Sequence, residues 1–384
     1  MTAQRILFVS HTGQLGGAEF VLLDIARHYR DRCHVVLLAD GPLRSLLAAS
    51  SISVGVVPAD HAMLSVRRQG QVLSALSVVP AALSAAWHVA RAARGYDILY
   101  PNSQKAAVVT MLAGQLLHKP VVWHLHDILS LDHFGRVQRR AVMTLANRSA
   151  KWIVTNSEAS RDAFVACGGK ADRITVVPNG IDAAPFVAIS DAVAARLRRE
   201  FGAAGCRLVG VFGRLAPWKG QHLLIEALPK LPGVHALVVG DALFGETDYR
   251  AQLEERAGVL GVSERVHMLG FRNDVPALMR SADVIAHTST APEPFGRVLV
   301  EGMLAQRPVV AASGGGAREV LGATYEHIVP PGDPTALADA IARVLATPQD
   351  AAATLAAANF ARATKLFSIE RMLSGIDRAL AQAA

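Results

Sequence analysis

The chain has 384 residues, of which 51% are hydrophobic and 18% charged, with 39 Lys and Arg against 32 Asp and Glu. This composition excludes a disordered segment and a collagen-like fibre. At roughly 150 residues per domain, the length favours two domains, with one large barrel as the alternative, and either can bury a full core. The three cysteines form no CxxC pair, so they support neither a disulfide framework nor a thiolate zinc site and are typical of a reducing cytoplasm.

The excess positive charge lies in the first half of the chain. Residues 1–185 contain 19 Lys and Arg against 12 Asp and Glu, whereas residues 186–384 contain 20 of each. Basic clusters such as Arg139, Arg140 and Arg148 alternate with apolar residues, which is typical of a surface that meets anionic lipid or a phosphorylated substrate. A plain solvated helix face is the alternative for any one cluster. Nucleic acid is not an expected partner, because no nucleic-acid-binding motif is present and only 5% of residues are aromatic.

One stretch has the length of a membrane span. Residues 69–90 contain no Asp, Glu, Lys or Arg. Serines, Pro80 and many alanines argue against insertion, because alanine contributes little to it. We expect a buried or membrane-touching helix there. The first residues lack a signal-peptide pattern, so secretion is not expected.

Short β-branched runs alternate with amphipathic or alanine-rich stretches, a pattern typical of parallel α/β folds. We expect a strand at residues 5–10 followed by a helix at 18–29, and a second strand at 34–39 followed by a helix at 43–50. Further strands are expected at residues 97–100, 120–124, 152–155 and 174–177. Proline and glycine interrupt the pattern at 177–186. It then resumes with expected strands at residues 207–212, 236–239, 266–269, 284–286, 309–311 and 328–329.

The fold class predicted from this pattern is α/β, with two Rossmann-like, doubly wound parallel-sheet domains. We expect them at residues 1–184 and 185–348, followed by helices in 349–384 that cap the second domain or cross back to the first. Ligands of such sheets bind at the carboxyl ends of the strands. The loops that follow the strands are therefore where a site is expected.

The loop after the first strand contains Gly16 and Gly17 at the start of a helix. Their amides suit contact with a phosphate or a substrate, and a plain tight turn is the alternative. Asp40 follows the second strand, where a nicotinamide-dependent oxidoreductase would have a ribose-binding acid. The loop lacks the Gly-x-Gly-x-x-Gly spacing, so the sequence gives little support to the oxidoreductase alternative.

The loop at residues 213–220 begins the second domain. It contains Arg214 and Lys219, two cations around a turn at the end of a strand. An arginine binds a diphosphate through paired hydrogen bonds and a lysine adds a point charge. We expect a diphosphate site here, with a pair of plain surface cations as the alternative.

Residues 293–301 follow a later strand and enter a helix expected at 296–305. Glu293 lies in the loop and Glu301 inside the helix, so the two carboxylates have separate tasks. The amides of Phe295 and Gly296 at the helix start suit an anion, and a glutamate accepts hydrogen bonds from vicinal hydroxyls.

Four segments together resemble family 4 of the retaining glycosyltransferases of the GT-B superfamily, of the bacterial polysaccharide and glycolipid type. They are residues 16–19, 178–182, 213–220 and 293–301, and the resemblance spans nearly the whole chain. It implies two domains facing a central cleft, with a nucleotide-sugar donor held by the second and an acceptor by the first. It also implies metal-independent transfer with retention of configuration, with a nucleoside diphosphate sugar as co-substrate and no cofactor.

The resemblance assigns roles to single residues. Arg214 and Lys219 would bind the donor diphosphate and Glu301 the ribose hydroxyls. Glu293, with the amides of Phe295 and Gly296, would bind the sugar and phosphate. Gly16 and Gly17 would line the cleft from the first domain.

His126 matches the active-site histidine of the family. Its side chain suits a hydrogen bond to a sugar hydroxyl or leaving oxygen near neutral pH. His124 shares its side of the extended segment and Asp127 points away, which argues against a metal site. The chain also lacks the Asp-x-Asp element of metal-dependent transferases of the GT-A fold.

The expected function is retaining transfer of a hexosyl group to a hydroxyl of a lipid-linked or anionic glycan acceptor, in polysaccharide or glycolipid synthesis. The expected location is cytoplasmic and peripheral on the inner face of the membrane, through the basic N-terminal domain. A GT-B-fold nucleotide-sugar epimerase is the first alternative function, and an NAD(P)-dependent oxidoreductase is a second alternative with less support from the sequence.

Overall fold

The computed structural model describes residues 4–57, 73–129, 136–242 and 248–383. The chain forms two compact units: unit 1 comprises residues 1–180 and 369–384, and unit 2 residues 181–368. The division falls at Gly180, four residues before the end of the first domain expected from the sequence.

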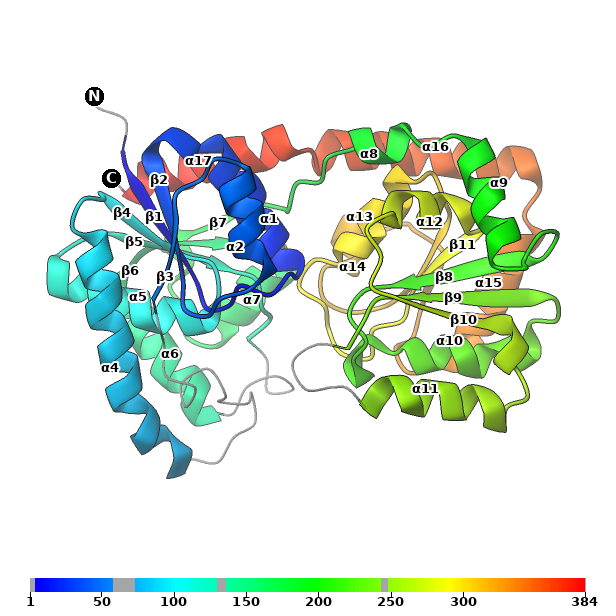
Figure 1. Ribbon diagram of the computed structural model, residues 1–384, viewed down its shortest axis with the longest axis horizontal. Helices are drawn as coiled ribbons and strands as arrows, with labels where there is room; N and C mark the ends of the chain where they lie inside the picture. Colours follow the sequence, from blue (N-terminus) through cyan, green and yellow to red (C-terminus); the bar gives the residue numbers. More distant parts are fainter. Residues whose placement is uncertain (1–3, 58–72, 130–135, 243–247, 384) are drawn as a thin grey trace. The chain divides into compact units, whose positions relative to one another are not determined.

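Unit 1 is built on a parallel sheet of seven strands in the order β3-β2-β1-β4-β5-β6-β7 (Figure 1). The strands are β1 (Ile6–Ser10), β2 (Cys33–Leu37), β3 (Val54–Val56), β4 (Ile98–Pro101), β5 (Val121–Leu125), β6 (Ala150–Thr155) and β7 (Ile174–Val176). Six of them lie where the sequence predicts strands. The short edge strand β3 was missed, because three residues with Gly55 in the middle form no apolar run.

Helices cover both faces of this sheet, as the nearly continuous apolar strands require. Leu7 and Val9 face a core that includes residues of α4 (Leu73–Ala93), α5 (Gln104–Leu117) and α6 (Arg136–Ser149). Ile6 and Phe8 face a second core. That core includes residues of α1 (Gly17–His28), α2 (Pro42–Ala49) and α17 (Ile369–Ala383). Helix α7 (Glu158–Ala166) contributes Phe164 to the first core.

Unit 2 has a parallel sheet of six strands in the order β10-β9-β8-β11-β12-β13. The strands are β8 (Arg207–Phe212), β9 (Val234–Val239), β10 (Val266–Gly270), β11 (Val284–His287), β12 (Val309–Ala312) and β13 (Ile328–Val329). All six confirm strands predicted from the sequence. The two units thus repeat one architecture.

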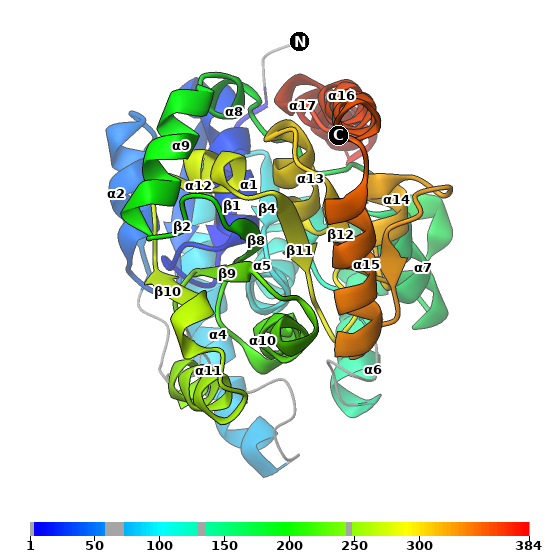
Figure 2. The same ribbon diagram turned by 90° about the vertical axis from the view of Figure 1, so that its right-hand side faces the viewer.

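Helices also lie on both faces of the second sheet, with α12 and α13 on one side and α10 on the other (Figure 2). The helices are α8 (Ala184–Val187), α9 (Asp191–Glu200), α10 (Gln221–Ala227), α11 (Asp248–Val259), α12 (Val275–Ser281), α13 (Arg297–Leu304), α14 (Ala317–Leu321), α15 (Pro334–Ala346) and α16 (Gln349–Leu366). At their carboxyl ends the strands continue into loops, and it is in these loops that the sequence predicts the site.

The C-terminal segment is divided between the units. Helix α16 belongs to unit 2, whereas α17 belongs to unit 1. The hydroxyl of Tyr29, at the end of α1, donates to Oδ1 of Asp377 at 2.5 Å. Gly375 of α17 lies so close to Val177 that a Cβ there would be 2.7 Å from the valine side chain. The last helix is therefore part of the fold of the first unit.

Pro80 lies inside α4, so the described part of the uncharged stretch 69–90 is helical; residues 69–72 lie outside the described part of the chain. None of the helices described has both the length and the apolar character to cross a lipid bilayer.

Candidate active site

Two strand-end loops of unit 2 are bound to each other. The hydroxyl of Thr288, after β11, donates to the carbonyl of Lys219, after β8, at 2.8 Å. The amide of Thr290 donates to the carbonyl of Trp218 at 2.8 Å. Gly220 has a φ of 70°, and a Cβ there would lie 2.1 Å from the carbonyl oxygen of Thr288. Only glycine allows this approach, so the backbone itself holds the Lys219 turn beside the loop that contains Glu293.

The Glu293 carboxylate accepts three hydrogen bonds. Nζ of Lys219 donates to Oε1 at 2.6 Å. Nε2 of His287 and Oγ of Ser289 donate to Oε2 at 2.7 Å and 2.9 Å. The side chains of Lys219 and Glu293 are only 17% and 14% exposed, so this ion pair is largely shielded from water. The structure thus brings together two residues that the sequence placed in separate motifs.

The surroundings of Glu293 keep it ionised. Burial alone would raise the pKa of Glu293, but the charge of Lys219 and the hydrogen bond from His287 outweigh it and lower that pKa far below its ordinary value. The site therefore contains a fixed carboxylate, suited to accept hydrogen bonds rather than to donate a proton.

A glycine-rich turn after β12 supports the Glu293 loop. The amide of Gly316 donates to the carbonyl of Glu293 at 2.9 Å. Gly315 has a φ of 54°, and a Cβ there would lie 1.9 Å from the same carbonyl oxygen. The turn at residues 313–316 consequently acts as a backbone support for the carboxylate.

Trp218 joins the two cations predicted to bind a diphosphate. The ammonium of Lys219 lies 4.5 Å from the centre of the Trp218 ring, and the guanidinium carbon of Arg214 lies 5.9 Å from it. Both contacts are within the range of cation–π attraction. The carbonyl of Arg214 accepts from the Gln221 side chain at 2.8 Å, which fixes the strand-end turn. Arg214 and Lys219 thus converge on one indole ring.

Helix α13 begins at Arg297, with Gly296 as its N-cap at a φ of 82°. This confirms that Glu293 precedes the helix and that Glu301 lies inside it. The Phe295 side chain is 3% exposed and packs against Phe367, so its contribution to a ligand site is its backbone. The amides at this helix start carry the positive end of the helix dipole.

Glu301 pairs with a cation of its own helix, Nε of Arg297 lying 3.5 Å from its Oε1. Burial raises the pKa of Glu301, while the charges of Arg297 and Lys219 act in the opposite direction. Glu301 therefore shares the electrostatic surroundings of Lys219 and Glu293.

In unit 1, His126 directly follows β5. Its Nε2 lies 3.0 Å from Oδ1 of Asn102, the first residue after β4. His124 packs against it, with ring centres 3.9 Å apart, and is fully buried with Nδ1 3.0 Å from the Tyr100 hydroxyl. Burial lowers the pKa of His124 well below its ordinary value, so that residue is a neutral neighbour.

The first glycine loop has two features of its own. Gly13 approaches Gly41 so closely that a Cβ would lie 2.5 Å from the Gly41 nitrogen. A Cβ built at Gly16 would lie 2.8 Å from Oε2 of Glu19. An acidic side chain of the same helix thus faces the helix start near Gly16 and Gly17, which favours contact with neutral hydroxyls over a phosphate there.

Three residues of these clusters were missed from the sequence: Asn102, His287 and Ser289. Each is a polar residue at or just after the carboxyl end of a strand. That position was the available signal, but strand-end polar residues are common and no motif singles these out.

Comparison with known proteins agrees with this architecture. Residues 15–185 match the family model "Glycosyltransferase Family 4", and residues 196–361 match "Glycosyl transferases group 1". A phosphatidyl-myo-inositol mannosyltransferase of Mycobacterium tuberculosis is 34% identical over 65% of this chain and 65% of its own length. A D-inositol 3-phosphate glycosyltransferase of Mycolicibacterium gilvum is 28% identical over 74% of this chain and 67% of its own. Several curated relatives are thus matched over less than two thirds of their length, for example 64% in Xylanimonas cellulosilytica.

Solved structures give a fuller match. Anabaena Alr3699/HepE, crystallised with UDP and glucose, is 41% identical over 99% of this chain and 100% of its own, with a TM-score of 0.88. The lipopolysaccharide outer core galactosyltransferase WaaB, at 16% identity and a TM-score of 0.68, shares the fold. The chain therefore belongs to the family 4 (group 1) glycosyltransferases of the GT-B superfamily.

Proposed function

We propose that this protein transfers a hexosyl group from a nucleoside diphosphate sugar, with UDP-glucose as the first candidate, to a hydroxyl acceptor with retention of configuration. The observation that carries the proposal is the cluster of Arg214, Lys219 and Glu293 on two interlocked loops of unit 2. The crystal structures of HepE with UDP-glucose and with UDP and glucose support the choice of donor.

The cations are the proposed diphosphate site. Arg214 and Lys219 neutralise the charge that develops on the leaving diphosphate, which supports a transfer without a metal ion. The amides of Phe295 and Gly296 at the start of α13 add donors to the phosphate. Because Lys219 already binds Glu293, an arriving phosphate shares this ammonium with the carboxylate rather than meeting an isolated cation.

The two glutamates are the proposed hydroxyl acceptors. A carboxylate offers about four lone-pair sites. Three donors already occupy Glu293, so about one site is left for a sugar hydroxyl. Glu301 is the proposed partner of the ribose hydroxyls. From unit 1, His126 contributes a hydrogen bond to a substrate hydroxyl or the leaving oxygen, and Gly16 and Gly17 contribute backbone contacts.

The donor assignment is tested by thermal unfolding with UDP, GDP, ADP, their sugar conjugates and NAD(P). A ligand that binds the native state raises the midpoint by mass action. We expect UDP and UDP-glucose to stabilise the wild type, and Arg214→Ala and Glu301→Ala to lose most of that shift. Stabilisation by NAD(P) alone would contradict the proposal, and release of an isomerised sugar nucleotide without acceptor would favour the epimerase.

For the acceptor, we propose a lipid-linked or anionic glycan at the inner face of a membrane. Helices α4, α5 and α6, which line one core of unit 1, contain no Asp or Glu. Val79, Leu83 and Trp87 recur every four residues along α4 and are 52%, 55% and 54% exposed. An apolar stripe beside basic helices is typical of proteins that lie on anionic lipid.

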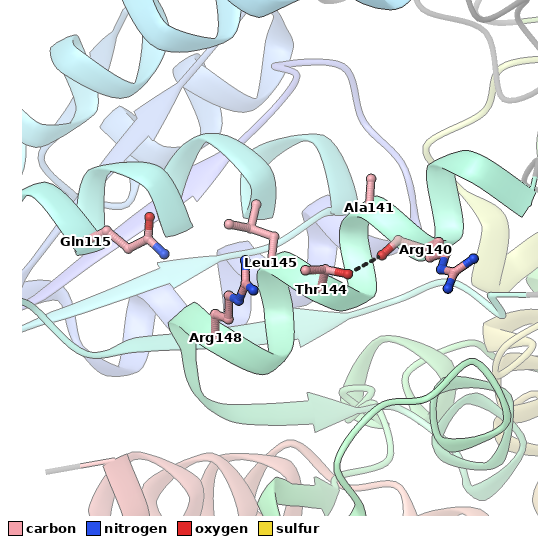
Figure 3. A pocket seen from close by; sticks show the side chains of 6 residues that line it. All are labelled: Gln115, Arg140, Ala141, Thr144, Leu145 and Arg148. Atoms are coloured by element: carbon pink, nitrogen blue, oxygen red, sulfur yellow. Dashed lines mark hydrogen bonds between the residues drawn. The ribbon is translucent and has the colours of Figure 1, made fainter.

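A pocket of about 590 Å³ lies between α5 and α6 (Figure 3). Arg140, Thr144 and Arg148 line it at four-residue spacing, with Gln115 from α5 and the apolar Leu145. Two exposed guanidinium groups around an apolar wall suit a phosphate joined to a hydrocarbon chain.

Vesicle flotation tests the membrane proposal. Vesicles of phosphatidylcholine with phosphatidylglycerol should carry the protein, and those of phosphatidylcholine alone should not. Trp87→Ser and Arg140→Glu should each weaken binding, whereas Val259→Ser, an exposed apolar residue of unit 2, is the matched control. Equal recovery with both vesicle types, or none with either, would contradict the proposal.

A further inference from the structure

Asn102 contacts three other segments at the carboxyl edge of the first sheet: strand β1, the start of helix α1 and the residue after β5. It follows β4, is fully buried, and its backbone amide donates to the carbonyl of Val9 at 2.9 Å. Its side chain makes two further contacts. Nδ2 lies 2.9 Å from the carbonyl oxygen of Ala18 in α1, and Oδ1 lies 3.0 Å from Nε2 of His126 after β5. Both polar atoms of the amide are thus engaged.

These contacts allow one arrangement of hydrogens. A backbone carbonyl only accepts hydrogen bonds, so the Asn102 amino group must face Ala18 and Oδ1 must face His126. An amide oxygen also only accepts, so Nε2 of His126 must carry a hydrogen. The neutral imidazole therefore has its lone pair on Nδ1.

The neighbouring ring adds no competing charge. His124 packs beside His126 and is kept neutral by burial, while the Tyr100 hydroxyl lies against Nδ1 of His124. The contact with the Asn102 amide is one that distinguishes the two nitrogens of His126, because the amide oxygen requires a hydrogen on Nε2.

We propose that Asn102 is a positioning residue for His126. It fixes the Nε2–H tautomer, orients the ring from the end of β4 and ties it to the first turn of α1 through Ala18. His126 then accepts a hydrogen bond through Nδ1 from a substrate hydroxyl. The substrate contact rests on the proposed function, whereas the tautomer does not.

The test is the imidazole ¹⁵N spectrum of the full-length protein with labelled histidine, recorded without substrate, the His126 signals being assigned by their loss in His126→Gln. We expect a protonated Nε2 and an unprotonated Nδ1 in the wild type. In Asn102→Ala the two tautomers should mix. Asn102→Asp keeps an acceptor for Nε2 and should restore the wild-type pattern, although it loses the donor to Ala18.

Asn147 supplies a matched control. Its side chain also bridges two backbone groups, donating to the carbonyl of Gly168 at 2.8 Å and accepting from the amide of Lys170 at 3.3 Å. Asn147→Ala should leave the His126 signals unchanged. A hydrogen on Nδ1 in the wild type, or an unchanged pattern in Asn102→Ala, would overturn the proposal.

Kinetics give a second readout. With UDP-glucose, Asn102→Ala should lower kcat on the order of 10-fold to 100-fold, as for groups that orient histidine ligands, with little change in donor KM. Unchanged kcat would overturn the positioning role. A wild type that transfers no sugar would contradict the proposed function instead, and the spectrum would still decide the role of Asn102.

Discussion

At the scale of single residues, the Lys219–Glu293 pair combines stability and function. Removing one partner of a buried ion pair leaves an uncompensated charge, which typically costs about 3–5 kcal/mol. The same pair keeps Glu293 ionised, as its proposed role as an acceptor for a sugar hydroxyl requires. When the lysine is replaced, the carboxylate keeps the hydrogen bonds from His287 and Ser289 but loses the charge that balances its own.

We expect Lys219→Met to lower the free energy of unfolding at pH 7 by about 3 kcal/mol. The pKa of Glu293 is lowered in the native state, so the stabilisation is present above the ordinary glutamate pKa and is lost as pH falls toward the native pKa. The variant should thus differ less from the wild type in acid than at pH 7. Urea unfolding at several pH values measures this.

Arg44→Ala is the control, because the Arg44–Asp40 pair is more than half exposed on both sides. Its loss should change stability by less than about 1 kcal/mol. Equal effects of the two substitutions would contradict the shielded character of the Lys219–Glu293 pair.

At the scale of elements, the site depends on turns rather than on helices or strands. The Gly315 turn holds the Glu293 loop through a backbone contact that no side chain would tolerate. We expect Gly315→Ala to displace that loop, to lower stability by about 1–3 kcal/mol and to weaken UDP binding. Thermal unfolding with and without UDP measures both effects.

Gly332 offers the comparison at this scale. It has a φ of 77°, but nothing lies within 4 Å of a Cβ built there. Gly332→Ala should therefore cost about 1 kcal/mol from backbone strain alone and leave UDP binding intact. A similar loss of binding in both variants would show that strain, not the contact with Glu293, is responsible.

At the scale of the whole molecule, the two units differ in how the chain builds them. Unit 2 is continuous, whereas unit 1 needs residues 369–384 from the C-terminal end. Helix α17 contributes Met372, Ile376 and Leu380 to the core that also contains Ile6 and Phe8. Burying each such side chain stabilises the fold by about 1.5–3 kcal/mol.

We expect a fragment of residues 181–368 to unfold cooperatively and to retain UDP binding. A fragment of residues 1–180 should lack a cooperative transition, because the face covered by α17 is then exposed to water. Circular dichroism during heating measures both. Cooperative unfolding of the 1–180 fragment would show that α17 is dispensable for this unit.

The sequence by itself determined the two parallel sheets, since short apolar runs and the glycine turns between them are local signals. It also located Arg214, Lys219, Glu293 and Glu301 in strand-end loops, from motifs that resemble a family. The edge strand β3 escaped it, because its three residues are held by pairing with β2 rather than by their own pattern.

The tertiary structure decided which side chains meet. The bonds from Lys219 to Glu293 and from His126 to Asn102 join loops after different strands, which a local pattern treats as separate. The assignment of α17 to unit 1 depends in the same way on a distant surface, through Tyr29 and Asp377. Hydrophobic periodicity is a property of neighbouring residues, whereas a hydrogen bond between two strand ends depends on the sheet order that brings them together.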